Sequence, residues 1–178
     1  ETMTDLFPTA PPPSAPSLFS EASSTTIRVI DVETAGRRLE EDAVIEIGSV
    51  DLDLETGRIF NSMQTLVSPG GVEIDPHARR VHKITDEMLE GAPPFEEAVR
   101  PFATIGSFAA QRASFDRSRL RLPGTWFCTY KLALRAFPDV KAHGLQSLVK
   151  YVPLDLADVS AELEGLHPHR ALFDALCT

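Results

Sequence analysis

The chain has 178 residues, of which 43% are hydrophobic and 24% are charged, and its formal net charge is −9. This length and balance are typical of one ordinary globular domain. The only two cysteines, Cys128 and Cys177, are too few and too isolated for a disulfide framework or a cysteine zinc site, so we expect a reducing, cytoplasmic setting.

Residues 1–26 form a Pro/Ser-rich segment that holds five of the fourteen prolines and no lysine or arginine. The segment has no continuous apolar run, which excludes a secretory signal or a transmembrane helix, and we expect no membrane partner. Its composition predicts a flexible arm, followed by one folded domain over 27–178. Within the arm, Ser17-Leu18-Phe19 is a candidate contact for a polymerase or clamp, although a solvated tail fits the composition better.

Three strands are expected between residues 27 and 67. Residues 27–32 and 43–52 are rich in β-branched and apolar side chains, as strands are. A tight turn at 55–58 then leads into a third strand over 59–67. Because the connections are short, this part of the chain is predicted to form an antiparallel meander.

Helices and short strands are expected to alternate in the rest of the chain. The helical segments are an N-capped turn at 85–88, an amphipathic stretch at 95–102, a helix that carries Asp116, and helices at 130–137, 145–152 and from about 170. The short strands are 108–110 and 126–128. A meander followed by this alternation predicts an α/β fold, with a mixed sheet flanked by helices.

Two acidic side chains, Asp31 and Glu33, come at the end of the first expected strand. Residues two apart on a strand point to the same face, so the two carboxylates are neighbours. Such neighbours repel unless a cation lies between them, and Mg²⁺ or Mn²⁺ is suited to oxygen ligands. A solvated acidic pair beside a turn is the commoner explanation of this pattern taken alone.

Positive charge is concentrated in one part of this acidic chain. Residues 111–150 contain two acidic side chains and eight basic ones, namely Arg112, Arg117, Arg119, Arg121, Lys131, Arg135, Lys141 and Lys150. This surplus is suited to phosphate contacts, and an ordinary solvated helical face explains it equally well. The net charge of −9 does not exclude a nucleic-acid partner, since metal ions can lie between carboxylates and phosphates.

The acidic motifs, taken together and in order, resemble those of the DEDDh (DnaQ-like) 3′–5′ exonuclease family. The resemblance covers residues 27–178, and its motifs are Asp31-x-Glu33-Thr34, Phe115-Asp116 and His169-x-Ala171-x-x-Asp174. Residues 127–133 and 143–148 are most similar to the exodeoxyribonuclease X-like branch. The resemblance implies a ribonuclease H-like fold, in which parallel strands extend the antiparallel meander.

The resemblance also implies a two-metal phosphodiester hydrolase. Two divalent ions, Mg²⁺ or Mn²⁺, would be held by four carboxylates, those of Asp31, Glu33, Asp116 and Asp174. His169 would be the general base, a role that its usual pKa suits at neutral pH. Candidate substrate contacts are Thr34, His82 and Arg112. For Thr34 and His82, a purely structural role is an equal alternative.

The expected function is release of 5′-nucleotides from DNA 3′ ends, with single strands favoured, in repair or proofreading. An RNA-trimming exoribonuclease of the ribonuclease T or oligoribonuclease kind is one alternative. A non-catalytic, polymerase-associated binding module is another. Three features depart from the family pattern: Gln111-Arg112 stands where His-Asn is usual, the link of residues 117–125 between Asp116 and Trp126 is short, and only four residues follow Asp174, where a longer helix is implied.

Overall fold

The computed structural model describes residues 25–36, 38, 42–152 and 164–178. The predicted arm over 1–26, with its Ser17–Phe19 tripeptide, lies outside this part except for its last two residues. Within the described ranges, no helix is both long enough and apolar enough to cross a membrane.

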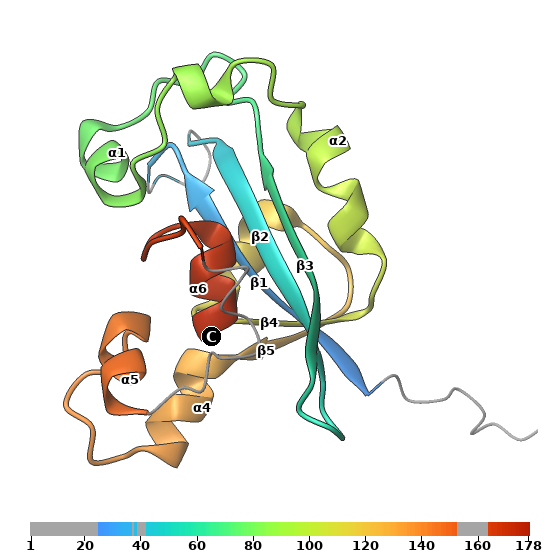
Figure 1. The fold of residues 1–178 in the computed structure, drawn as a ribbon, viewed down its shortest axis with the longest axis vertical. Coiled ribbons are helices and arrows are strands. Elements are labelled where there is room, and N and C mark those ends of the chain that lie inside the picture. Colours follow the sequence, from blue (N-terminus) through green and yellow to red (C-terminus); the bar gives the residue numbers. More distant parts are fainter. Residues whose placement is uncertain (1–24, 37, 39–41, 153–163) are drawn as a thin grey trace, which may run out of the picture.

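Five strands form a single mixed sheet in the order β3-β2-β1-β4-β5 (Figure 1). Their bounds are β1 Thr26–Thr34, β2 Val44–Asp53, β3 Ile59–Leu66, β4 Ser107–Ala110 and β5 Thr125–Cys128. The pairs β1–β2 and β2–β3 are antiparallel, whereas β4 runs parallel to both β1 and β5. The predicted meander and its parallel extension are therefore confirmed.

Six α-helices accompany the sheet in the described part of the chain: α1 Pro76–His82, α2 Phe95–Ala98, α3 Ala113–Leu120, α4 Thr129–Ala136, α5 Leu145–Tyr151 and α6 Ala171–Cys177. Helix α1 was not predicted, although Asp75-Pro76 is a helix-start signal. The Asp75 carboxylate accepts hydrogen bonds from the amides of His77 and Ala78, and Pro76 occupies the first helical turn.

The prediction of one helix over 95–102 is wrong. Helix α2 ends at Ala98, and a separate 3₁₀ turn follows over Arg100–Ala103. Pro101 explains the break, because it has no backbone N–H and disfavours helical geometry in the residue before it. Phe102 is nevertheless buried in the core, so the predicted apolar face still packs on the sheet.

Both faces of β1 are covered. Ile30 and Val32 pack in the larger apolar cluster together with Phe102. Val29 points the other way and packs with Leu172 of α6, which lies against β1 and β2 (Figure 1). We call this second side the α6 face. By the two-residue alternation of strands it also carries Asp31, Glu33, Glu46 and Gly48.

Gly48 allows α6 to approach the sheet closely. A Cβ atom at this position would lie 2.1 Å from the backbone nitrogen of Leu172 and 2.3 Å from the carbonyl carbon of Ala171. These neighbours are backbone atoms that cannot rotate away. The start of α6 therefore depends on the absence of a side chain at Gly48.

We expect Gly48→Ala to destabilise the protein by about 1–3 kcal/mol, because overpacking displaces α6. Urea unfolding of the purified variant measures this change. Gly106→Ala is the matched control, since a Cβ at Gly106 meets nothing within 4 Å, and it should change the free energy of unfolding by less than about 1 kcal/mol. Equal stability of the two variants would contradict the close approach of α6.

Candidate functional site

The carboxylates of the first motif lie on the α6 face, near the end of β1. In the register with β2, Asp31 is opposite Gly48 and Glu33 is opposite Glu46. Helix α6 brings Asp174 to the same place. One oxygen of Glu33, one oxygen of Asp174 and one ring nitrogen of His169 all lie within 4.8 Å of one another. The structure thus brings together residues that are more than 130 positions apart in the chain.

Asp116 reaches the same site from α3. Its side chain is buried, and its carboxylate accepts a hydrogen bond from the backbone of Val32 on β1. Asp116 is also the nearby charge that most raises the pKa of Asp31. Its Oδ1 atom is buried and has no hydrogen-bond partner among the described residues. A buried carboxylate oxygen without a donor fits a cation ligand.

Burial and mutual repulsion hold protons on this acidic group. The pKa of Asp31 is raised well above its usual value by burial and then by Asp116 and Glu33. Burial, together with Asp174, raises the pKa of Glu33 to about 9, and burial raises that of Asp116 to about 7. The pKa of Asp174 is raised as well, again by burial. These carboxyls cannot all ionise at neutral pH without added positive charge, which a divalent cation would supply.

His169 lies immediately before α6, beside Asp174. Its backbone is left-handed, with φ of 67°, and its amide donates to Asp174 Oδ1 at 3.3 Å. The imidazole Nδ1 is 3.9 Å from Asp174 Oδ2, and 47% of the side chain is exposed to solvent. The ring therefore borders the carboxylates and remains accessible to water.

The family model described as Exonuclease, of the RNase T type, matches residues 29–178. The chain belongs to this exonuclease family. It is 37% identical over 153 residues to exodeoxyribonuclease 10 of Escherichia coli K12, and the alignment covers 85% of this chain and 64% of that relative. The epsilon subunit of DNA polymerase III from Aquifex aeolicus is 31% identical over 166 residues, covering 86% of this chain and 76% of the subunit.

Solved structures agree with this assignment. Exonuclease X in complex with 5′ overhanging duplex DNA is 35% identical, with a TM-score of 0.69 and 85% of each chain covered. Exonuclease I of E. coli with a dT13 oligonucleotide shares the fold at 14% identity, with a TM-score of 0.68 over 86% of this chain and 39% of that one. The predicted ribonuclease H-like fold is confirmed. Divalent-metal dependence is general in this exonuclease family.

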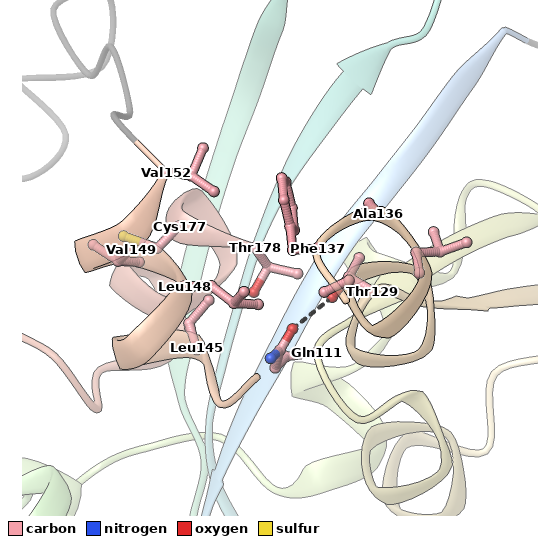
Figure 2. A pocket seen from close by; sticks show the side chains of 12 residues that line it. Gln111, Thr129, Ala136, Phe137, Leu145, Leu148, Val149, Val152, Cys177 and Thr178 are labelled. Carbon is pink, nitrogen blue, oxygen red and sulfur yellow. Dashed lines mark hydrogen bonds between the residues drawn. The ribbon is translucent and has the colours of Figure 1, made fainter. Parts of the chain in front are cut away.

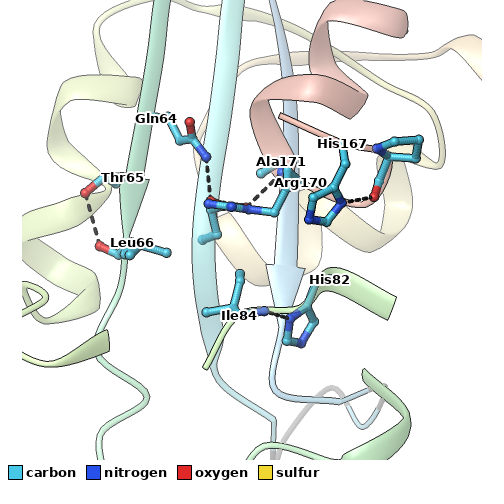
Figure 3. A network of polar contacts seen from close by, with 10 residues as sticks. Gln64, Thr65, Leu66, His82, Ile84, His167, Arg170 and Ala171 are labelled. Atoms are coloured by element: carbon cyan, nitrogen blue, oxygen red, sulfur yellow. Dashed lines mark hydrogen bonds and ion pairs between the residues drawn. The ribbon is translucent and has the colours of Figure 1, made fainter. Parts of the chain in front are cut away.

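His82, the last residue of α1, is fully buried in this exonuclease domain, and Glu46 is the acid whose charge acts on it. Its Nδ1 accepts a hydrogen bond from the amide of Ile84 at 2.9 Å (Figure 3). Burial lowers the pKa of His82 to about 4, so the ring is neutral at pH 7 and carries its proton on Nε2. Nε2 has no partner among the described residues. A buried donor of this kind calls for a partner, such as the oxygen of a water or of a bound ligand that reaches it.

Thr34 and Arg112 occupy different surroundings. The Thr34 side chain is buried, and its hydroxyl donates to the carbonyl of Gly36, so it stabilises the chain just after β1. Arg112 is exposed before α3, with its guanidinium 4.9 Å from the ring centre of Tyr130. The hydroxyl contact favours the structural alternative for Thr34, whereas the exposed guanidinium of Arg112 remains accessible to a phosphate.

Gln111, at the position where the family usually has histidine, connects three segments. Its side-chain amide donates to the carbonyl of His143 at 2.8 Å and accepts from the Thr129 hydroxyl at 2.8 Å. Figure 2 shows the second bond at the edge of an apolar cavity of about 300 Å³, which is lined mainly by α4 and α5 and by the end of α6. This departure from the family pattern thus holds α4 and the segment before α5 against β4.

Sequence reasoning missed two residues of this site. Gln146 of α5 extends its side-chain nitrogen to within 3.5 Å of Asp174 Oδ1. Glu46 of β2 is fully buried beside the acidic group and raises the pKa of both Asp31 and Glu33. A single acid inside the apolar run of residues 44–50 is a signal that could have identified Glu46, because buried carboxylates need a partner.

Proposed function

We propose that this chain is a divalent-metal-dependent 3′–5′ exonuclease, which hydrolyses phosphodiester bonds at DNA ends and releases 5′-nucleotides. The observation that carries the proposal is the convergence of the Asp31–Glu33 pair with Asp116 and the His169–Asp174 pair on the α6 face. Similarity to exodeoxyribonuclease 10 supports DNA as the substrate. A role in repair or proofreading forms part of this proposal.

The four carboxylates of Asp31, Glu33, Asp116 and Asp174 would hold two divalent ions, Mg²⁺ or Mn²⁺. The oxygen-rich donor set, the raised pKa values and the unpartnered Oδ1 of Asp116 support this assignment. Bound ions of this kind supply positive charge to the phosphoryl oxygens and the leaving oxygen, and make water more acidic. The carboxylates contribute their fixed positions at the end of β1 and on α3 and α6.

His169 would accept the proton of the attacking water. Its Nδ1 faces the Asp174 carboxylate, so a proton is favoured on Nδ1, and Nε2 is left as the acceptor. Solvent access to the ring allows the proton to leave after each turnover. His82 Nε2 and the Arg112 guanidinium would contact the substrate, and Thr34 would shape the pocket beside them.

Replacing His169 with alanine is expected to lower kcat by about 10²–10⁴-fold, the usual contribution of a general base. Mn²⁺ affinity, measured by calorimetry, should remain within about threefold, because the four carboxylates are retained. His77→Ala, which removes an exposed histidine on α1, is the control and should behave like the wild type. Full activity of the His169 variant would exclude it as the base.

The proposal is tested with oligonucleotides labelled at the 3′ end. Single-stranded DNA, 5′-overhanging duplex DNA and RNA of the same sequence are incubated with Mg²⁺ or with EDTA. We expect Mg²⁺-dependent release of 5′-mononucleotides, fastest from single-stranded DNA. Faster release from RNA would favour the exoribonuclease alternative. No release from any substrate would contradict the proposal and favour the non-catalytic binding module.

Two further parts of the proposal concern the surroundings of the enzyme. A polymerase or clamp would be contacted through the Ser17–Phe19 tripeptide, on the basis of its apolar composition alone. A cytoplasmic location is supported by the two cysteines, Cys128 and Cys177, which are both free thiols.

A further inference from the structure

Glu46 is a fifth carboxylate beside the proposed metal ligands, and it is fully buried. Its partners come from β3 and from the two residues at the start of α6, the N-cap Arg170 and the first helical residue Ala171. Arg170 Nε lies 3.0 Å from each carboxylate oxygen, and Arg170 Nη2 also donates to Oε1. The amide of Ala171 donates to Oε2 at 2.9 Å, and the side-chain amide of Gln64 donates to Oε1. Figure 3 shows Gln64, Arg170 and Ala171 gathered at this point.

These donors leave Glu46 no capacity to bind a metal ion. A carboxylate offers about four lone-pair sites, and the contacts from Arg170, Ala171 and Gln64 occupy them. The guanidinium also balances the charge of the carboxylate, as buried ion pairs require. Glu46 therefore differs from Asp116, whose Oδ1 has no donor among the described residues. Its chemistry is that of a residue that holds another segment in place.

The segment that Glu46 holds begins directly after His169. Arg170 and Ala171 are the next two residues, and Asp174 follows one helical turn later. His169 has a left-handed backbone, which is unfavourable for a residue with a Cβ and persists only where the surrounding structure imposes it. The bonds from Glu46 to the Arg170 side chain and the Ala171 amide supply that restraint immediately C-terminal to the unfavourable residue.

We infer that the Glu46–Arg170 pair is a positioning pair for the nuclease site, an inference that rests on the proposed function. It fixes the start of α6 against β2, so that His169 keeps its left-handed backbone and its ring stays beside Asp174 and Glu33. Neither residue touches substrate in this role. Gly48, two positions further along β2, completes the arrangement by allowing the α6 backbone to come close.

Glu46→Gln tests this inference with almost no change in volume. The new amide group places N–H donors against the donors of Arg170 and Ala171, so the start of α6 should shift. Because partners that orient metal ligands typically contribute 10–100-fold, we expect kcat to fall by about 10–100-fold, while the KM for single-stranded DNA changes by less than about threefold. Mn²⁺ affinity, measured with the metal alone, should fall by about 10-fold.

The matched control is Asp51→Asn. Asp51 lies on the same strand and forms a buried bidentate pair with Arg28, with contacts of 2.7 and 2.8 Å, on the face of the sheet opposite the proposed ligands. Both variants should melt at a lower temperature than the wild type. Only Glu46→Gln should change kcat and Mn²⁺ affinity. If both variants changed kcat and Mn²⁺ affinity equally, the inference would be overturned. The Glu46–Arg170 pair would then contribute to stability alone.

A readout without catalysis separates this inference from the proposed function. NMR spectra of the metal-free protein, labelled with ¹⁵N-histidine, provide this readout. The chemical shifts of the His169 ring nitrogens should change in Glu46→Gln and remain unchanged in Asp51→Asn. This comparison holds even if the wild type releases no nucleotides. If Glu46→Gln does not fold, Arg170→Lys replaces it. That variant keeps the charge and loses the second N–H contact, so it should move the same signals and lower kcat less; unmoved signals would overturn the inference.

Discussion

Replacing Asp31 with asparagine is expected to abolish nucleotide release while making the metal-free protein more stable. The loss of activity follows from the position of Asp31 among Glu33, Asp116 and Asp174. Residues that merely orient a metal ligand contribute about 10–100-fold. Loss of a ligand at the centre of the site should therefore lower kcat by about 10³-fold or more.

The gain in stability has a different physical cause. Burial and neighbouring acids raise the pKa of Asp31, so its ionised form is unfavourable in the folded protein. Asparagine has nearly the same shape and no charge, and it removes this penalty. Since one pKa unit corresponds to about 1.4 kcal/mol, the melting temperature in EDTA at pH 8 should rise by several degrees, as measured by calorimetry.

Asp51→Asn provides a control of opposite sign. Asp51 neutralises the buried Arg28, so its replacement should lower the melting temperature and leave the turnover of each folded molecule unchanged. The pair of variants thus separates stability from activity. An Asp31→Asn protein that still releases nucleotides, or that melts earlier than the wild type in EDTA, would contradict the assignment of Asp31.

The second large effect concerns the free energy of unfolding. We expect it to fall as pH rises in the metal-free protein and to rise with pH when divalent ions are bound. Without metal, Asp116 and Glu33 have pKa values of about 7 and 9 when folded, against 3.8 and 4.5 as reference values. The folded protein then binds more protons than the unfolded chain over this range, so its stability must fall as pH rises. His82, whose pKa is lowered from 6.5 to about 4, opposes this trend below pH 6.5. The fall should therefore be clearest between pH 6.5 and 9.

Saturating Mg²⁺ or Mn²⁺ should change the sign of this slope. Metal binds the ionised carboxylates, so its affinity and the stability that it adds both grow as protons leave. Urea unfolding at pH 6.5, 7.5 and 9, with EDTA and with Mg²⁺, measures both slopes. The double variant Glu33→Gln, Asp116→Asn should flatten both. Parallel slopes with and without metal would show that the acidic group does not bind the ion.

Much of the fold could be predicted because it depends on neighbouring residues. Two-residue alternation places Asp31 and Glu33 on one face, and the short turn at 55–58 requires an antiparallel pair. Helix α1 was missed even though its start, Asp75-Pro76, is equally local. The broken helix after Ala98 could likewise have been inferred from Pro101.

The amino-acid sequence by itself determined the strands, most helices and the ordered set of acidic motifs, which identified the exonuclease family. Only the tertiary structure showed that Glu46 pairs with Arg170, 124 residues away, and that Gly48 lies against the backbone of α6. The physical reason is the range of the interactions. Strand alternation and turn chemistry act over a few residues, whereas the pairing of a buried carboxylate depends on which distant helix packs over its strand.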